Sequence, residues 1–427
     1  MSDATQGPGT TQAPAGAGEL ASSRGLATRV AAWLRPAWVE VDLGAVSANV
    51  AHIARAVTPA QVCAVVKADG YGHGAVPVAR AALAGGAVSL GVAVAEEGHQ
   101  LRSAGITTPV LVLSEPPPAA MEMIVADRLT PTIYTDAGLV ALTAAARATA
   151  ANGHKPTATA PVPVPVHVKL DTGMHRVGAD AATALRLAQA VAAEPSLHFD
   201  GLFTHLAVAD EPANAYTAAQ LAALEAVAAQ LSRQGCPPVL LHAANSAGAL
   251  LHPRARYDMV RAGIAAYGVA PAAALESHPA VRPLRPALSL KARVSFVKEV
   301  PAGERLSYGL HYELARRSVV ATVPLGYADG VPRRLFEVGG EVLVRGRRYP
   351  VVGAVTMDQI LVDCGPRSDV VAGDEVVLIG RQGSAEVGAW EWAQRLGTIA
   401  YEVTCALSAR LPRVYLPAGA GARAGLA

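Results

Sequence analysis

Short apolar runs alternate with longer Ala- and Leu-rich segments between residues 44 and 281. The runs that suit buried strands are Val62–Lys67, Ser89–Ala95, Pro109–Ser114, Thr130–Thr135, Val164–Leu170, Phe199–Leu206, Val239–His242 and Asp258–Arg261. One intervening segment ends at Gly235 and repeats apolar residues at helical intervals, namely Ala218, Leu221, Leu224, Ala228 and Leu231. Apolar strands that alternate with helices are typical of a parallel sheet that is buried on both faces.

The eight βα units predict an α/β protein with a (β/α)8 barrel of the TIM type over residues 44–281, because such barrels typically take about 250 residues. An open, doubly wound sheet is the alternative that the alternation alone leaves open. The number of units favours the barrel.

The pattern changes after Pro286, where strand-like runs follow one another with turn residues and few helical segments between them. These runs are Ala287–Val300, Ser318–Val323, Glu341–Val344, Tyr349–Val352, Gln359–Val362 and Glu375–Ile379. They predict a mainly antiparallel β domain over residues 282–417. The alternating run Ala37–Asp42 suits a strand, so we expect residues 36–43 to join that domain.

Both ends of the chain are rich in small residues, and we expect disordered tails at 1–35 and 418–427. The Pro-rich stretch His154–Pro165 suits a stiff, extended insertion before the fifth strand. Residues 1–35 lack the apolar region of a signal peptide. No apolar stretch approaches the roughly 20 residues of a membrane span. These features predict a cytoplasmic protein with no membrane partner.

The composition narrows the function. The 427 residues are 52% hydrophobic and 16% charged, with a formal net charge of +2. This near balance argues against a nucleic-acid partner, because such proteins normally carry a basic excess. The four cysteines lie far apart without metal-ligand spacing, so we expect reduced thiols and no metal.

Candidate chemistry lies at the ends of the predicted barrel strands, where barrel enzymes carry their active sites. Lys67 closes the first strand and precedes a Gly-rich turn over residues 68–74. A lysine among core residues either extends to the rim or is functional. Desolvation lowers the pKa of such an ammonium group and leaves an amine that can form a Schiff base.

Further cationic and hydrogen-bonding residues follow the fifth to eighth strands: Lys169, Arg176, His205, Asn245, Ser246, Arg261, Gly263 and Ile264. Their convergence on one rim predicts a site for an anionic, phosphorylated ligand. Pyridoxal 5′-phosphate fits these residues, and a class I aldolase fits them nearly as well. In the β domain, spacing alone does not decide whether Tyr308, Met357 and Tyr401 are functional or structural.

Several motifs together resemble the alanine racemases, which are fold-type III pyridoxal-phosphate enzymes. The resemblance extends from Ala37 to Tyr415 and rests on the order and spacing of Val66–Gly74, Lys169–Gly178, His242–Ser246, Arg261–Ile264, Leu306–Gly309, Met357–Gln359 and Tyr401–Val403. It implies an isomerase that interconverts L- and D-alanine and supplies D-alanine for peptidoglycan.

The resemblance also implies residue roles. Lys67 would bind pyridoxal 5′-phosphate and act as acid or base on the D face of the α-carbon. Tyr308 of the partner subunit would act on the L face, with His205 hydrogen-bonded to it. Arg261 would donate to the pyridine nitrogen and keep it unprotonated, because arginine does not readily lose its proton.

The remaining implied roles concern binding. The cofactor phosphate site would comprise Tyr71, Ser246, Gly263, Ile264 and Tyr401, and Asn245 would be a further cofactor-binding residue. Arg176 would bind the substrate carboxylate, assisted by Met357 of the partner subunit. Lys169 would be a site of carbamylation that orients Arg176. Because Tyr308 and Met357 would act across the interface, the resemblance implies a homodimer with shared active sites.

Three other functions share parts of this pattern. A broad-specificity amino-acid racemase would differ chiefly in the room around the substrate side chain. A fold-type III amino-acid decarboxylase would need an acidic partner for the pyridine nitrogen, and Arg261 disfavours it. A non-enzymatic cofactor-binding protein would need only the barrel, and the β domain with Tyr308 disfavours it.

Overall fold

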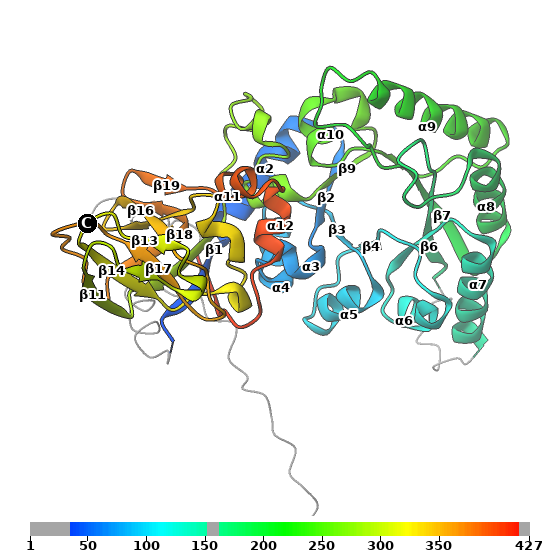
Figure 1. Ribbon diagram of the computed structural model, residues 1–427. Coiled ribbons are helices and arrows are strands. Elements are labelled where there is room, and N and C mark those ends of the chain that lie inside the picture. The colour runs from blue at the N-terminus through cyan, green and yellow to red at the C-terminus, as the bar shows by residue number, and fades with distance from the viewer. Residues whose placement is uncertain (1–34, 152–161, 418–427) are drawn as a thin grey trace, which may run out of the picture.

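A barrel and a β domain make up the elongated molecule (Figure 1). The computed structural model describes residues 35–151 and 162–417. The tails expected at 1–35 and 418–427 therefore lie outside the described residues, apart from Arg35, and so does most of the expected Pro-rich insertion. In the described part of the chain, no helix combines the length and the apolar character needed to cross a membrane.

All eight runs expected to form barrel strands do so within the described residues. The strands are β2 (Gln61–Val65), β3 (Ser89–Val92), β4 (Val110–Val112), β5 (Thr130–Ile133), β6 (Val164–Lys169), β7 (Leu197–Phe203), β8 (Leu240–His242) and β9 (Met259–Ala262). They pair in parallel in the order β8-β7-β6-β5-β4-β3-β2-β9. This sheet confirms the predicted fold class.

Backbone hydrogen bonds join the two ends of this sheet. The Asp258 N–H donates to the Leu241 carbonyl at 3.1 Å, and the Arg261 N–H donates to the Ala244 carbonyl at 2.9 Å. These bonds close the gap between β8 and β9, so the sheet is a barrel and not the open alternative. The carboxyl ends of the strands consequently form a single rim.

Helices follow the strands and cover the outside of the barrel (Figure 1). They are α2 (Leu43–Val57), α4 (Ala75–Ala84), α5 (Ala95–Ser103), α6 (Met121–Ala126), α7 (Asp136–Ala151), α8 (Ala181–Ala193), α9 (Tyr216–Arg233) and α10 (Ser246–Leu251). The side chains of Asp42, Asp180 and Asn245 accept backbone N–H groups in the first turns of α2, α8 and α10, and such bonds favour helix initiation there. In α9 the apolar positions Leu221, Leu224 and Leu231 are buried, as their spacing predicts.

The β domain is built on one long sheet. Its strands are β1 (Ala37–Asp42), β10 (Leu288–Arg293), β11 (Phe296–Val300), β14 (Ser318–Val323), β15 (Glu341–Val344), β16 (Arg347–Val352), β17 (Ile360–Asp363), β18 (Glu375–Gln382) and β20 (Arg413–Leu416). Their order is β11-β14-β17-β16-β15-β18-β10-β1-β20. Most neighbours are antiparallel, whereas β20 pairs in parallel with β1.

Two shorter pairings complete this domain. The strand β19 (Ala385–Val387) extends the long sheet beside β18, and β12 (Arg305–Leu306) pairs with β13 (Tyr312–Glu313). In the sequence, β12 and β13 flank Tyr308.

One expected strand is in fact two. The run expected as a single strand over Ala287–Val300 breaks after Arg293, because β10 pairs with β1 and β18 whereas β11 pairs with β14. The backbone N–H groups of Val294 and Ser295 bond to different neighbours, Asp374 and Thr322. The chain therefore changes partners at a point where its apolar sequence gives no signal.

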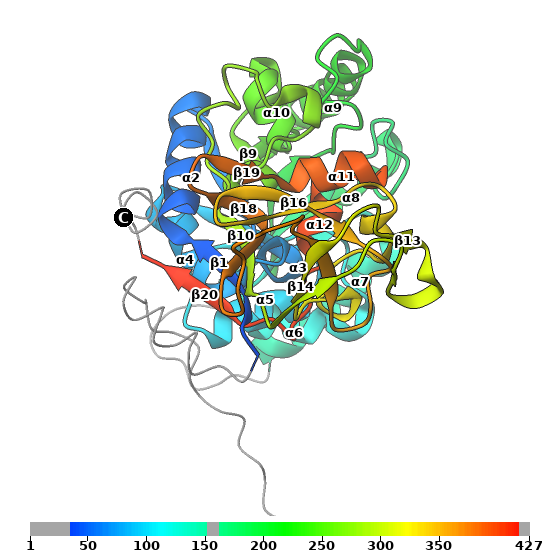
Figure 2. The same ribbon diagram turned by 60° about the vertical axis from the view of Figure 1, so that its left-hand side comes forward.

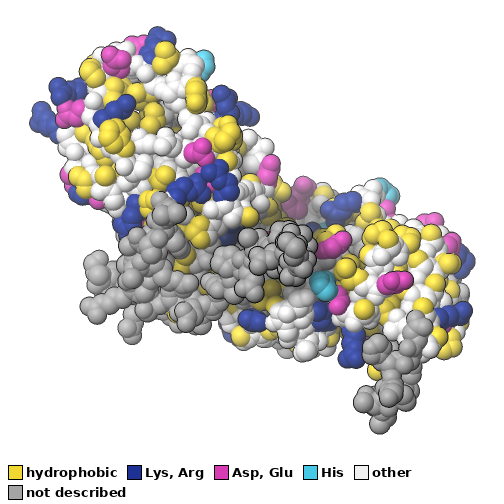
Figure 3. All heavy atoms as spheres, turned by 90° about the horizontal axis from the view of Figure 1, so that it is seen from below, with side chains coloured by type: hydrophobic (Ala, Val, Ile, Leu, Met, Phe, Trp, Pro, Cys, Tyr) yellow, Lys and Arg dark blue, Asp and Glu magenta, His cyan; other side chains and the backbone are white. Residues whose placement is uncertain are grey.

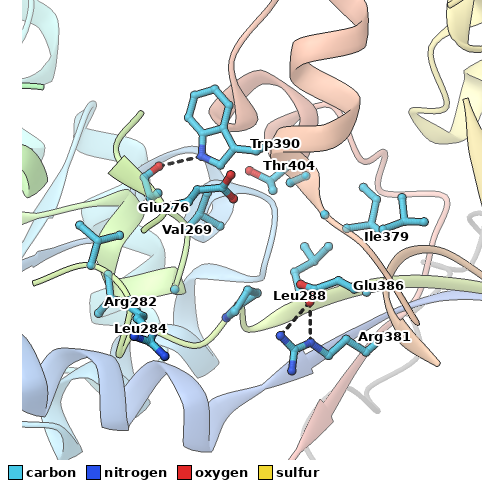
Figure 4. A pocket seen from close by; sticks show the side chains of 18 residues that line it. Val269, Glu276, Arg282, Leu284, Leu288, Ile379, Arg381, Glu386, Trp390 and Thr404 are labelled. Atoms are coloured by element: carbon cyan, nitrogen blue, oxygen red, sulfur yellow. Dashed lines mark hydrogen bonds and ion pairs between the residues drawn. The ribbon is translucent and has the colours of Figure 1, made fainter. Parts of the chain in front are cut away.

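Two short helices, α11 (Ala389–Leu396) and α12 (Ala400–Cys405), lie between the β domain and the barrel (Figures 1 and 2). The Trp390 indole N–H donates to the Ala270 carbonyl at 2.9 Å and so connects α11 to the segment that follows β9 (Figure 4). We did not expect these helices from the sequence, because helical periodicity requires a window of about 11 residues or more.

The surface carries charges of both signs. In Figure 3, Lys and Arg side chains are interspersed with Asp and Glu side chains on both domains. This distribution agrees with the near balance of 36 basic and 34 acidic residues.

Close backbone packing around Gly268 predicts a large stability effect. Gly268 follows β9 with φ +78°, and an added Cβ would lie 1.7 Å from the Arg285 carbonyl oxygen. We expect Gly268→Ala to lower the free energy of unfolding by about 3 kcal/mol or more. The control Gly105→Ala has a similar φ of +80° and open space, so only about 1 kcal/mol should be lost there. Urea unfolding of both variants tests this, and equal losses would contradict it.

Candidate active site

A cavity of about 560 Å³ lies at the carboxyl ends of the barrel strands. Of the thirteen site residues expected from the sequence, eleven line this cavity within the described ranges: Lys67, Tyr71, Lys169, Arg176, His205, Asn245, Ser246, Arg261, Gly263, Ile264 and Tyr401. Ten of them follow or end barrel strands, and Tyr401 comes from α12. The fold therefore brings residues that are up to 334 positions apart in sequence into one site.

Lys67 enters this cavity from an unusual piece of backbone. It begins α3 (Lys67–Tyr71), in which Ala68, Asp69 and Tyr71 have φ values of 53°, 50° and 54°. Residues with side chains rarely adopt this left-handed conformation, which costs about 1–2 kcal/mol for each of them. Surrounding bonds must therefore hold the turn.

Two carboxylates hold the turn after Lys67. The Glu97 carboxylate accepts the backbone N–H groups of Ala68 and Ala93, both at 2.7 Å. The Asp69 carboxylate accepts the Ala75 N–H at 2.9 Å. These bonds fix the residue that directly follows Lys67 against the end of β3.

Small and hydroxyl-bearing residues form a cradle beside the turn. The Ser246 hydroxyl oxygen accepts the N–H groups of Gly263 and Ala265 at 3.0 and 3.2 Å. A Cβ on Gly263 would lie 2.5 Å from the Tyr71 hydroxyl, so only glycine lets this hydroxyl approach the backbone so closely. Burial raises the pKa of the Tyr71 and Tyr401 hydroxyls, which therefore stay protonated and can donate. Such a donor set suits a phosphate group.

Cationic groups line the rest of the cavity. Burial lowers the pKa of Lys67, and the nearby Arg176 lowers it further. Burial together with Arg261 and Arg176 lowers the pKa of Lys169 to about 7. Lys169 Nζ lies 3.4 Å from the Leu113 carbonyl oxygen. An anionic ligand would offset this concentration of positive charge.

The Arg261 guanidinium is buried and bonded on several sides. It donates to the carbonyl oxygens of Thr204 and Ala243, each at 2.8 Å, and approaches His242 Nδ1 at 2.6 Å and His205 Nδ1 at 3.3 Å. Burial and the positive charge of Arg261 hold the pKa of both histidines well below the ordinary value. Both imidazoles are therefore neutral and can accept hydrogen bonds from Arg261.

Hydrogen bonds connect His242 to two residues that were not among the site residues expected from the sequence. His242 Nε2 lies 2.9 Å from His167 Nδ1, and His167 Nε2 lies 3.0 Å from an Asp200 carboxylate oxygen. The available signal was a polar residue inside an apolar strand, because His167 lies within β6 and Asp200 within β7. Both residues precede the ends of their strands, where the expected site residues lie.

Tyr308 and Met357 do not line the barrel cavity of their own chain. They belong to the β domain, where the two residues are 72% and 52% exposed. Tyr308 lines a separate hollow together with Ser307, Thr356, Gln359 and Leu361. Within one chain, Tyr308, which is expected to act on the L face, therefore lies outside the cavity that holds Lys67.

Family models match nearly all of the described chain. The model for the alanine racemase N-terminal domain matches residues 41–271, and the model for the alanine racemase C-terminal domain matches residues 287–415.

Individual proteins agree with these models. The chain is 47% identical over 382 residues to the alanine racemase of Symbiobacterium thermophilum, and this match covers 90% of the chain and 97% of that protein. It is 43% identical over 379 residues to the alanine racemase of Thermobifida fusca, covering 88% and 96%. The solved structure of the alanine racemase from Streptomyces coelicolor A3(2) has a TM-score of 0.82 at 39% identity, covering 89% of this chain and 98% of that one. The chain therefore belongs to the alanine racemase family of enzymes.

Proposed function

We propose that this enzyme interconverts L- and D-alanine with pyridoxal 5′-phosphate, as a homodimer with shared active sites. Its cytoplasmic role would be to supply D-alanine for peptidoglycan. The observation that carries the proposal is one cavity that holds the Lys67 amine, the Arg261 guanidinium and the cradle around Ser246. The proposal treats residues 44–281 as the cofactor-binding unit and 282–417, with 36–43, as the unit that presents Tyr308.

The residues of the cavity fit this cofactor. The Gly263 backbone and the hydroxyls of Tyr71, Ser246 and Tyr401 line the cavity and suit its phosphate, with Asn245 and Ile264 beside them. Arg261 faces the same cavity and would donate to the pyridine nitrogen. When bound, pyridoxal phosphate supplies an electron sink that makes the α-proton of alanine more acidic.

Racemisation needs one group to remove a proton and another to return it to the opposite face. Lys67 would serve the D face, and its lowered pKa favours the neutral amine that accepts a proton. Tyr308 of the partner subunit would serve the L face, and its exposure on the β domain leaves it accessible to a second chain. His205 would hydrogen-bond to that tyrosine.

Substrate binding would use the remaining cationic groups. Arg176 lines the cavity and would hold the alanine carboxylate, together with the backbone N–H of Met357 of the partner subunit. A carbamate on Lys169 would place a negative charge among Lys67, Arg176 and Arg261, whose positive charges all lie near it. That charge would orient Arg176.

Arg261 also separates this proposal from a decarboxylase. A carboxyl group at this position would protonate the pyridine ring, whereas buried Arg261 keeps its proton even though burial lowers its pKa to about 10. A broad-specificity racemase uses the same groups, so only substrate comparison distinguishes it.

The first test is to follow loss of α-deuterium from L- and D-alanine with the purified, cofactor-loaded enzyme. We expect exchange from both enantiomers and net interconversion, with the visible absorbance band of the cofactor lost in Lys67→Ala. Tyr308→Phe should keep that band and lose exchange from L-alanine more than from D-alanine. Release of carbon dioxide, or turnover of neither enantiomer, would show that the chain is not an alanine racemase in function.

The Glu97 carboxylate should influence the pH at which Lys67 captures the cofactor. Its charge raises the pKa of the Lys67 amine and its oxygens hold the adjacent turn. Glu97→Gln removes the charge, so the pH midpoint at which the apoenzyme captures pyridoxal phosphate should shift to lower pH. Rapid-mixing absorbance over a pH series measures the midpoint. Glu96→Gln, an exposed neighbour in α5, is the matched control, and equal behaviour of the two variants would contradict the prediction.

Lys169 predicts a pH-dependent modification. Its pKa is about 7, so the amine is mainly protonated below that pH and neutral above it. Only the neutral amine attacks carbon dioxide, with release of a proton. With ¹³C-bicarbonate we therefore expect a carbamate NMR signal that grows as the pH rises through 7 and is missing in Lys169→Ala. A signal that persists in this variant would refute the assignment.

A further inference from the structure

We propose that Asp200 is a positioning residue for Arg261, to which it is connected through His167 and His242. The inference rests on the proposed function in that Arg261 would face the cofactor ring. Asp200 does not line the cavity, so any influence it has on the site passes through the side chains between.

The connection is a continuous hydrogen-bonded chain over four barrel strands. Arg261 on β9 meets His242 on β8 at 2.6 Å. His242 meets His167 on β6 at 2.9 Å, and His167 meets Asp200 on β7 at 3.0 Å. Arg261, His242 and His167 are buried, whereas the Asp200 side chain is 26% exposed. The hydrogen-bonded chain thus runs from the centre of the site to a partly exposed carboxylate.

Arg261 and Asp200, at the two ends of the hydrogen-bonded chain, determine the proton positions on the two histidines between them. Arginine has only donors, so His242 Nδ1 must accept. The neutral His242 ring then carries its proton on Nε2 and donates to His167 Nδ1. A neutral His167 ring in turn carries its proton on Nε2 and donates to the Asp200 carboxylate, which can only accept when ionised. The bond from His167 lowers the pKa of Asp200, in agreement with an ionised end.

The packing leaves room for this chain. The strand β7 lies between β6 and β8, and His167 reaches across it at Gly201. A Cβ on Gly201 would lie 2.7 Å from the His167 ring, so a side chain there would displace the imidazole. The Phe203 ring stacks on His242 with centroids 4.6 Å apart and an interplanar angle of 6°. The Phe203 ring therefore holds the His242 ring, and the missing side chain at Gly201 leaves room for the His167 ring.

The hydrogen-bonded chain affects the orientation of Arg261 because the direct partners of Arg261 are all neutral. They are two carbonyl oxygens and the imidazoles of His205 and His242. If Asp200 is removed, His167 loses the acceptor that selects its tautomer. Arg261 is then the only end that sets the tautomers, and no acceptor at the other end opposes the arrangement in which His242 turns an N–H toward the guanidinium, which offers only donors. Asp200 therefore helps to orient Arg261 by adding a second preference against that arrangement.

The test uses the full-length apoenzyme and the Asp200→Ala and Asp200→Asn variants. Imidazole ¹⁵N NMR reports the tautomers, with His167→Asn and His242→Asn used to assign the signals. Pyridoxal phosphate titration gives the affinity of each variant for the cofactor. The matched control is His198→Asn, because exposed His198 lies 3.8 Å from the other Asp200 oxygen and outside the chain.

We expect His167 and His242 to be neutral with protons on Nε2 in the wild type and in His198→Asn. Asp200→Ala should mix the tautomers of both rings and weaken cofactor binding by about tenfold. Asp200→Asn keeps an acceptor oxygen without the charge, so its tautomers should match the wild type and its affinity should fall between the two. This variant also gives a result if Asp200→Ala fails to fold.

Wild-type tautomers and cofactor affinity in Asp200→Ala would overturn the proposal. Protons on Nδ1 of His242 in the wild type would do so as well, and so would wild-type affinity in Asp200→Asn accompanied by altered tautomers. The proposed function fails separately: if the apoenzyme has the expected tautomers and the cofactor-loaded enzyme racemises neither enantiomer, the function is refuted and the positioning role is left intact.

Discussion

The desolvation of positive charge at the barrel rim is the constraint on which the site depends. Arg261 and Lys169 are buried at the ends of β9 and β6, and water cannot stabilise their charges there. Backbone carbonyls and neutral imidazoles surround Arg261, and burial lowers the pKa of Lys169 to about 7. An anionic cofactor, a carboxylate substrate and a carbamate would each relieve the same electrostatic cost.

Unusual backbone near the cavity supports the same arrangement. The left-handed turn after Lys67 is locally unfavourable, and the carboxylates of Glu97 and Asp69 stabilise it with bonds to backbone N–H groups. Gly263 and Gly201 lie where a Cβ would meet the Tyr71 hydroxyl and the His167 ring. The barrel provides a rigid frame, and these exceptions to regular structure shape the site within it.

The β domain contributes residues to the site of its own chain and, in the proposed dimer, to the site of the partner. Helix α12 carries Tyr401 into the barrel cavity of its own chain. Tyr308 and Met357 are instead exposed on a different part of the domain. The same domain therefore closes one wall of its own site and, in the proposed dimer, would supply the L-face residues of the partner's site. This arrangement would make catalysis dependent on association of two chains.

The sequence by itself determined the fold class and the residues that gather at the rim, because strand and helix periodicities are local and a polar residue at a strand end stands out against an apolar run. The short helices α11 and α12 could not be predicted because they are shorter than the window in which helical periodicity is visible. The break after Arg293 could not be predicted because it depends on which distant strands lie alongside. Only the tertiary structure decided that Ala68 and Asp69 adopt a left-handed turn and that Arg261 is linked to Asp200. The physical reason is that these features arise from contacts between residues far apart in the chain.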